Sequence, residues 1–172
     1  MVRPDPIEVL DSGRELSFSF DEMLKYHGGG SPGGVAHAFK VLERSLPLLD
    51  SARRLERRAI VIETAFGGPG ARDAFELVTR AVGEQRFSVD SSLIRPEFGR
   101  ARERFVFRLS YGDRSVTLTL RQGFVNDEFI DLARRATRTA AEEERLTAMK
   151  ADMAARVMAA AAKDVYEVAS PG

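Results

Sequence analysis

Hydrophobic positions in the first part of the chain predict helices around a glycine-rich loop. A short helix is expected over Asp21–His27, and a longer one follows the loop, with apolar residues three or four positions apart from Val35 to Leu49. Pro47 lacks an amide hydrogen, so the second helix is expected to kink or end near Ser45 to Leu48. The proline-bearing segment before residue 16 is weakly patterned and is expected to be a partly ordered arm.

Strand-like patterns dominate the middle of the chain. Ala59–Thr64 is a continuous apolar, β-branched run, which predicts a strand buried on both faces. A second glycine-rich loop follows, and then a helical pattern that begins near Ala74 and ends at Gly83. A strand is expected within Phe87–Ile94. Alternation with a period of two predicts an antiparallel hairpin of residues 105–111 and 116–120, with its turn at Gly112-Asp113.

The C-terminal segment is predicted to be helical from about Asn126 to Ala169. No glycine or proline interrupts it, and Thr139 with Glu142 forms a capping-box pattern, so two helices or one bent helix are expected. Its apolar stripe consists of Leu146, Met149, Met153 and Val157. Because such a stripe must be buried, it is expected to pack on the domain or on another chain, and we predict that the tail mediates homodimerisation.

The order of elements predicts an α+β fold. Residues 1–125 are expected to form a helix, a strand, a helix and three further strands, giving a mixed four-stranded sheet with helices packed on it. Residues 126–172 are expected to form a helical extension, either part of the same structural unit or a dimerisation arm. A chain of 172 residues can bury one substantial core.

Composition excludes several classes of function. The 26 basic and 26 acidic residues cancel, which argues against a nucleic-acid partner or an anionic membrane surface. Charged residues interrupt every apolar run, so no membrane span is expected. The absence of cysteine excludes disulfides, thiolate metal sites and a cysteine nucleophile. With no basic, then apolar, leader pattern at the N-terminus, the expected location is the cytoplasm.

The first glycine-rich loop carries the candidate ligand site. Backbone amides there could approach an anion at the N-terminus of the next helix, although no Walker or dinucleotide-binding pattern is present. An equally valid interpretation is a tight turn that needs positive φ. The candidate binding residues are Gly28, Gly29, Gly30, Ser31 and Gly33, with Arg100 from a later loop.

His27 and Glu63 are the candidate acid–base pair. His27 directly precedes the glycine loop, and Glu63 lies near the carboxyl end of the predicted central strand, where α/β folds place ligand-contacting groups. The alternatives are a hydrogen-bonded structural histidine and a carboxylate paired with arginine. A metal site made of His27, His37 and Glu63 is a further alternative.

Three motifs in order resemble the formylmethanofuran dehydrogenase E-subunit (FmdE-like) family over residues 16–125. The family has His-Gly-His-x-Cys-Pro-Gly where this chain has His27-Gly28-Gly29-Gly30-Ser31-Pro32-Gly33. The family's Glu-Thr strand end and later Asp-Ala are similar to Glu63-Thr64 and Asp73-Ala74, and its Asp-Tyr-Gly-Lys is similar to Glu97-Phe98-Gly99-Arg100. The family's second histidine, its cysteine and its later aspartate and cysteine correspond to Gly29, Ser31, Ala65 and Gly67.

The resemblance implies the family's fold and pocket without its metal chemistry. We therefore expect an accessory protein, with no cofactor and no metal, that binds a small, anionic ligand around the His27 loop. Its expected partners are this ligand, a second copy of the chain and a larger enzyme complex. The alternatives are an enzyme that uses His27 and Glu63, and metal binding through His27, His37 and Glu63.

Overall fold

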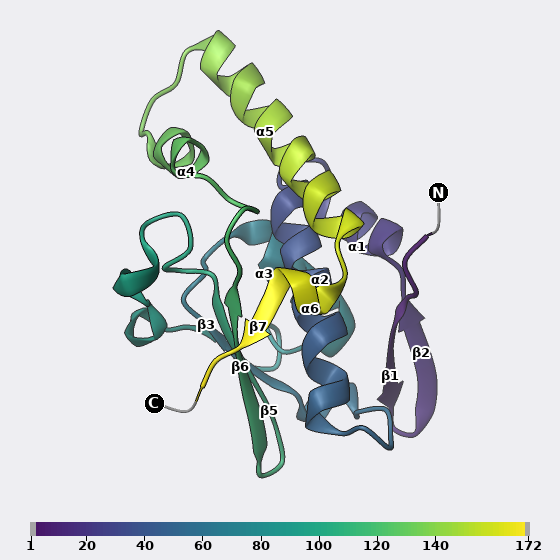
Figure 1. Ribbon diagram of the computed structural model, residues 1–172. Coiled ribbons are helices and arrows are strands. Elements are labelled where there is room, and N and C mark those ends of the chain that lie inside the picture. Colours follow the sequence, from purple (N-terminus) through teal and green to yellow (C-terminus); the bar gives the residue numbers. More distant parts are fainter. Residues whose placement is uncertain (1–2, 171–172) are drawn as a thin grey trace.

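A mixed five-stranded sheet forms the centre of the computed structural model, which describes residues 3–170 (Figure 1). The strand order is β4-β3-β5-β6-β7, with β3 and β4 parallel and every other pair antiparallel. The strands are β3 (Val61–Thr64), β4 (Phe87–Val89), β5 (Val106–Tyr111), β6 (Arg114–Leu120) and β7 (Tyr166–Val168). The predicted α+β class is thus confirmed.

Helix α2 lies at the centre of the helical layer (Figure 1). It packs against α1, α3 and α5 and contacts strands β5 and β6 of the sheet. The helices are α1 (Phe20–His27), α2 (Pro32–Leu49), α3 (Pro69–Thr79), α4 (Asp127–Arg134), α5 (Ala140–Ala159) and α6 (Ala162–Val165). Three short 3-10 helices are η1 (Arg57–Ala59), η2 (Ser91–Leu93) and η3 (Pro96–Phe98). Across residues 3–170, no helix has both the length and the apolar character needed to cross a membrane.

Two strand regions differ from the sequence-based prediction. The N-terminal arm is a hairpin of β1 (Ile7–Asp11) and β2 (Arg14–Phe18), whose turn residues Ser12 and Gly13 both have positive φ. The C-terminal segment is not helical throughout, because β7 adds a fifth strand to the predicted four by pairing with β6. Of the segment Phe87–Ile94, in which a strand is expected, only β4 (Phe87–Val89) is a strand.

Strand alternation assigns opposite faces of the sheet to neighbouring residues of β3. Ile62 pairs with Leu109, and both are fully buried in the core with the helices. Glu63, the next residue, points to the other face, where its carboxylate accepts a hydrogen bond from Arg108 Nε at 2.9 Å. The helices and Glu63 therefore lie on opposite sides of the sheet.

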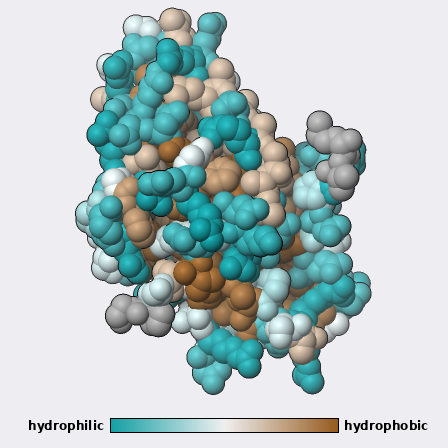
Figure 2. All heavy atoms as spheres, viewed as in Figure 1, coloured by the Kyte–Doolittle hydropathy of each residue, from teal (hydrophilic) through white to brown (hydrophobic). Residues whose placement is uncertain are grey.

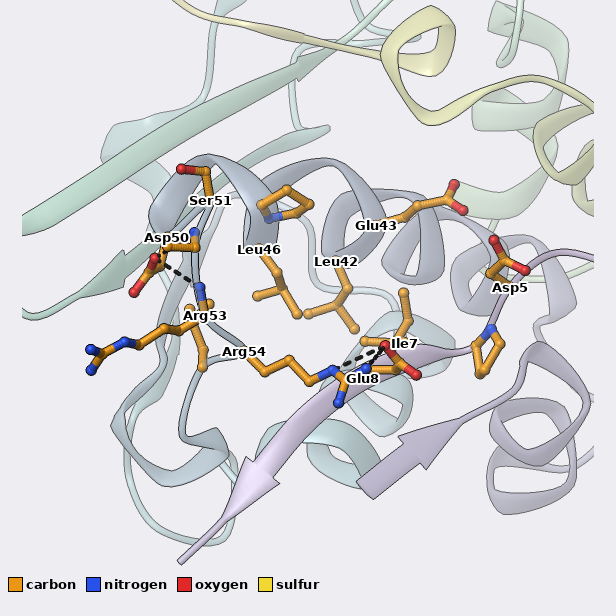
Figure 3. Close-up of a pocket in the computed structure, with 14 residues that line it drawn as sticks. Asp5, Ile7, Glu8, Leu42, Glu43, Leu46, Asp50, Ser51, Arg53 and Arg54 are labelled. Atoms are coloured by element: carbon orange, nitrogen blue, oxygen red, sulfur yellow. Dashed lines mark hydrogen bonds and ion pairs between the residues drawn. The ribbon is translucent and has the colours of Figure 1, made fainter. Parts of the chain in front are cut away.

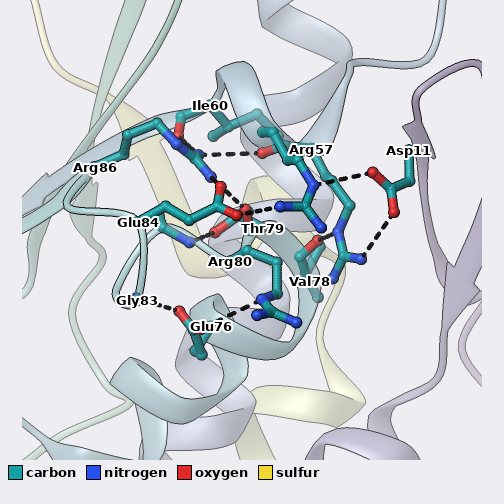
Figure 4. A network of polar contacts seen from close by, with 12 residues as sticks. Asp11, Arg57, Ile60, Glu76, Val78, Thr79, Arg80, Gly83, Glu84 and Arg86 are labelled. Atoms are coloured by element: carbon teal, nitrogen blue, oxygen red, sulfur yellow. Dashed lines mark hydrogen bonds and ion pairs between the residues drawn. The ribbon is translucent and has the colours of Figure 1, made fainter.

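The C-terminal end of α3 is held by two arginines from outside the helix (Figure 4). Arg57 donates to the carbonyl oxygens of Leu77 at 2.6 Å and Val78 at 2.9 Å, and Arg86 donates to that of Thr79 at 2.9 Å. These carbonyls have no partner within the helix, and the guanidinium charges match the negative end of its dipole. This arrangement fixes α3 relative to η1 and the start of β4.

The apolar stripe of the tail is buried within the chain. Leu146, Met153 and Val157 of α5 are buried, Met149 is half-buried, and α5 packs along α2. In Figure 1, α4 and the first half of α5 extend beyond the rest of the molecule. Figure 2, in the same view, shows a mostly hydrophilic surface with a hydrophobic area between β7 and the second half of α2. Burial of the stripe therefore needs no second copy, and homodimerisation stays a prediction without this argument.

Candidate functional site

The N-termini of α2 and α3 meet in direct backbone contact at glycines. A Cβ atom on Gly70 would lie 2.4 Å from the carbonyl oxygen of Ser31, and one on Gly34 would lie 3.1 Å from the amide nitrogen of Ala71. Any larger residue at Gly70 would collide with backbone that cannot rotate away. These glycines are therefore required by helix packing, an explanation that the sequence pattern alone did not supply.

The other loop glycines have different roles. Gly28 ends α1 with a φ of 91°, so it needs the left-handed region, and its amide donates to the Leu24 carbonyl at 2.8 Å. A Cβ on Gly29 or Gly67 would meet no atom within 4 Å. Gly29 and Gly67 thus line open space without a demand from packing or from positive φ.

A cavity of about 440 Å³ opens where the two helix N-termini meet. We call it the glycine-loop pocket. It is lined by Ser31, Gly33, Gly34, His37, Phe66, Gly67, Gly68, Pro69, Gly70, Arg100, Arg104, Phe105, Phe129, Ile130, Ala133, Arg134, Lys150 and Met153. Both glycine-rich loops, the loop that contains Arg100, and helices α4 and α5 therefore contribute to one site.

Positive charge without an acidic counterpart distinguishes this lining. Its charged residues are Arg100, Arg104, Arg134 and Lys150, and no carboxylate is among the lining residues. Arg100 is neutralised from outside, because Asp131 accepts two hydrogen bonds from it at 3.0 Å and raises its pKa. Among the described residues, the only acceptor for Lys150 is the Gly30 carbonyl, at 3.1 Å.

The two remaining arginines are weakly compensated. Arg134 lies 4.0 Å from a carboxylate oxygen of Glu103, at the limit of an ion pair. Arg104 is exposed and makes no ion pair or hydrogen bond with any part of the chain that the structure describes. The pocket thus keeps uncompensated positive charge.

Both helix N-termini add to this positive field. Neither helix has a side-chain N-cap, because the Ser31 side chain accepts no hydrogen bond from the first turn of α2 and Gly68, at the start of α3, has no side chain. Neither helix has an acidic residue in its first turn. Within residues 3–170, the amides of Gly33, Gly34 and Gly70 donate no backbone hydrogen bond. Free amides and the positive end of the helix dipole favour an anion.

His37 forms part of the pocket wall and is fully buried. Its Nδ1 lies 2.8 Å from the Tyr166 hydroxyl, and its Nε2 lies 3.2 Å from Met153 Sδ. Burial lowers the pKa of His37 to about 3, with a further contribution from the charge of Arg156. Burial also raises the pKa of Tyr166, so its hydroxyl stays protonated and can donate to Nδ1. His37 is therefore neutral near pH 7.

His27 has a different carboxylate partner from the one expected. Its Nδ1 lies 2.8 Å from Asp73 Oδ2 of α3, on the helical side of the sheet, whereas Glu63 lies on the opposite side with Arg108. The expected pairing of His27 with Glu63 is wrong, because strand alternation turns Glu63 away from the helices. His27 also lies outside the pocket lining, although its side chain is only 8% exposed.

The alternative metal set is also wrong. His27 pairs with Asp73, His37 pairs with Tyr166, and Glu63 pairs with Arg108 on the far side of the sheet. Within residues 3–170, no three histidine, aspartate or glutamate side chains are grouped as metal ligands would be. The three candidate ligands therefore do not converge.

Part of the predicted binding set does line the pocket. Ser31, Gly33 and Arg100 are lining residues, and Gly30 accepts the Lys150 hydrogen bond at the pocket edge. Gly28 and Gly29 are outside the lining. Sequence reasoning missed Arg104, Arg134 and Lys150. Arg104 lies in an arginine-rich segment, but nothing in the local sequence indicates that its side chain faces a pocket.

A second cavity, of about 420 Å³, lies between β1 and the C-terminal half of α2 (Figure 3). We call it the β1 groove. Its charges largely compensate one another, because Arg54 pairs with Glu8 at 2.7 Å and Glu43 accepts from Lys40 at 2.9 Å. Asp50 accepts from the backbone amides of Ala52 and Arg53, which lower its pKa.

No family model matches the sequence, and no curated protein shows significant similarity to it. The resemblance to the formylmethanofuran dehydrogenase E-subunit family therefore stays a prediction. The site has to be interpreted from its own geometry and charge.

Proposed function

We propose that the protein binds a small organic anion in the glycine-loop pocket. One observation carries this proposal: the lining has four cationic side chains and no carboxylate. Unpaired cations in a partly enclosed cavity favour a counter-charge, because the surrounding protein screens charge less than bulk water does. The free amides of the two helix N-termini would bind the same anionic group.

The walls of the pocket favour an organic ligand over a bare ion. Phe66 and Phe105 stack with their ring centroids 4.5 Å apart, and Phe129, Ile130 and Met153 complete an apolar surface. An apolar body placed there would remove the exposed parts of Phe66 and Phe129 from water, at roughly 25 cal/mol per Å². The ligand that fits is therefore an anion with an apolar portion.

The proposed biological role is that of a ligand-binding accessory protein similar to the formylmethanofuran dehydrogenase E-subunit family, without the family's metal chemistry. Support comes from the position of the pocket, because two of the three motif segments that carry the resemblance supply Ser31, Gly33, Phe66 and Gly67 to its lining. A cytoplasmic location, a homodimer and assembly into a larger enzyme complex belong to the same proposal.

Acid–base chemistry is a second candidate function, and one observation favours it. With Asp73 accepting from His27 Nδ1, the Nε2 atom is left free as a base, and it is buried without a partner among the described residues. Nitrogen-15 NMR tests this arrangement. Wild type should show Nε2 unprotonated at pH 8, and Asp73→Asn should change this tautomer. Protonated Nε2 in wild type at that pH would contradict it.

Titrations with matched aromatic probes test the proposed function. Benzoate is expected to shift amide NMR signals of residues 31–37 and 66–70, whereas neutral benzyl alcohol and cationic benzylamine are not. Arg104→Ala combined with Lys150→Ala should weaken benzoate binding by about tenfold or more, because each removes an uncompensated cation. Arg53→Ala in the β1 groove, which removes an exposed arginine elsewhere, is the control.

Two results would overturn the proposal. The first is equal binding of benzoate and benzyl alcohol, which would show that charge contributes nothing. The second is benzoate binding by the double variant that matches wild type, with the variant folded by circular dichroism.

A further inference from the structure

The donors around the glycine-loop pocket outnumber what a carboxylate can accept. They comprise the amides of Gly33, Gly34 and Gly70 and the side chains of Arg104 and Lys150, and Arg134 lies across the same cavity. A carboxylate has two oxygens with about four acceptor sites. A phosphate monoester has three terminal oxygens that are strong acceptors, so it uses this donor set more completely.

The charge of the site also exceeds that of one carboxylate. Within residues 3–170, Arg104 has no counter-ion and Lys150 donates only to a neutral carbonyl. The carboxylate nearest to Arg134, that of Glu103, is 4.0 Å away. A phosphate monoester carries about 1.5 to 2 negative charges near pH 7, against one for a carboxylate. The larger anion thus compensates the surplus charge better.

A further unpartnered donor or acceptor lies beside the same loop. The His27 side chain is only 8% exposed and its Nε2 has no partner among the described residues. This atom lies 4.0 Å from the position of a Cβ on Gly30, whose carbonyl holds the pocket residue Lys150. The loop therefore has an unpartnered polar atom beside the pocket, although His27 itself is not among the lining residues.

From these observations, we infer that the anion is a phosphate monoester of an aromatic or similarly flat apolar group. The inference rests on the proposed function and names its ligand class. The phosphate lies against the N-termini of α2 and α3, between Arg104 and Lys150. The flat group lies against Phe66, the partly exposed ring of the pair that Phe66 forms with Phe105.

Isothermal titration calorimetry with four probes tests this inference on the full chain. Phenyl phosphate, benzenesulfonate, benzoate and inorganic phosphate separate charge, oxygen number and apolar body. Phenyl phosphate is expected to bind about tenfold or more tightly than benzoate, since it adds charge and an acceptor oxygen. Benzenesulfonate has three oxygens but a single charge, and it is expected to lie between them.

Two variants identify the contacts. Arg104→Ala should reduce phenyl phosphate affinity by about tenfold and benzoate affinity less, because the doubly charged anion loses more attraction. Phe66→Leu should weaken phenyl phosphate several-fold, since the aromatic contact is lost, and leave inorganic phosphate unchanged. Arg53→Ala is the matched control for loss of an exposed arginine.

Each outcome separates this inference from the proposed function. If benzoate binds as tightly as phenyl phosphate, the phosphate class is wrong while anion binding stands. If inorganic phosphate binds as tightly as phenyl phosphate, the flat apolar group is wrong. If none of the anions binds wild type, the proposed function fails as well.

Discussion

Two cavities of similar volume lie at opposite ends of helix α2, and they differ in how their charges are compensated. The glycine-loop pocket, at the N-terminal end, keeps Arg104 and Lys150 without carboxylates. In the β1 groove, at the C-terminal end, Arg54 is paired with Glu8 and Asp50 is satisfied by backbone amides. Volume alone, about 440 against about 420 Å³, does not tell the two apart.

The proposed ligand site therefore rests on uncompensated charge and not on cavity size. In the β1 groove, the protein itself supplies the counter-charges, so a ligand would have to displace them. In the glycine-loop pocket, the two helix dipoles act in the same direction as Arg104 and Lys150, and within residues 3–170 no carboxylate pairs with either of these side chains. Four experiments test this contrast.

The largest expected effect comes from adding a methyl group at the close contact between α2 and α3 beside the glycine-loop pocket. Gly70→Ala is expected to lower the free energy of unfolding by about 3 kcal/mol, because its methyl group would overpack against fixed backbone. That carbon would lie 2.4 Å from the Ser31 carbonyl oxygen. Urea denaturation measures the change.

Gly67→Ala is the matched control for this substitution. Nothing lies within 4 Å of the added methyl group, and the change is expected to be neutral or to stabilise by about 0.5 kcal/mol. Equal effects of the two substitutions would contradict the packing explanation for Gly70.

Acidification is expected to destabilise the protein through the pocket residue His37. Its folded pKa is about 3, below the ordinary 6.5, so between these values the unfolded chain binds a proton that the folded chain does not. Stability therefore falls as the pH falls, by about 2 kcal/mol between pH 7.5 and 5. Urea denaturation of wild type and His37→Gln measures this, and the variant should lack that part of the slope. Equal slopes would refute the assignment.

Adding a carboxylate should make the glycine-loop pocket resemble the β1 groove. Ala133 is exposed on α4 and lines the pocket. Ala133→Glu is expected to weaken phenyl phosphate binding by about tenfold, equivalent to about 1.4 kcal/mol, because the new carboxylate competes for the cations. Ala133→Gln has nearly the same shape without the charge and should bind as wild type does. Similar losses in both variants would indicate a steric effect.

The smallest effect is expected beside the β1 groove, at an ion pair made by its lining residue Arg54. Glu15 is 73% exposed and pairs with Arg54, which also pairs with Glu8. Glu15→Gln should change the free energy of unfolding by about 0.5 kcal/mol or less, because exposed ion pairs contribute little. Urea denaturation at low and high salt measures it, and a loss above about 1 kcal/mol would show that this exposed pair matters more than expected.

The sequence pattern predicted most of the fold but not its short or terminal strands. The β5–β6 hairpin, the helix start near Asn126 and the capping box at Thr139 are found as expected. Strand β7 has only three residues, too few for a periodic pattern. It forms by antiparallel pairing with the edge of β6, which local sequence does not reveal. The β1–β2 hairpin did carry a signal, Ser12-Gly13 between apolar alternations, which the nearby prolines obscured.

The candidate site was predictable only where its residues are close in sequence. Ser31 and Gly33 belong to the first glycine-rich loop, which is recognisable from composition alone. Lys150 and Arg134 reach the pocket through the packing of α4 and α5, and no local pattern predicts which face of a helix meets a distant loop. Glu63 was misassigned because a continuous apolar run does not reveal which face of the sheet each residue takes.

The contact between Tyr166 and His37 has a consequence for synthesis of the chain. These residues are 129 positions apart, and the later one belongs to β7, near the C-terminal end of the described chain. Chains grow from the N-terminus, so a nascent chain that ends after α4 already contains both glycine loops but lacks Lys150, Met153 and the hydroxyl that holds His37. The proposed ligand is therefore expected to stabilise a chain that includes β7 and not a nascent chain that ends after α4.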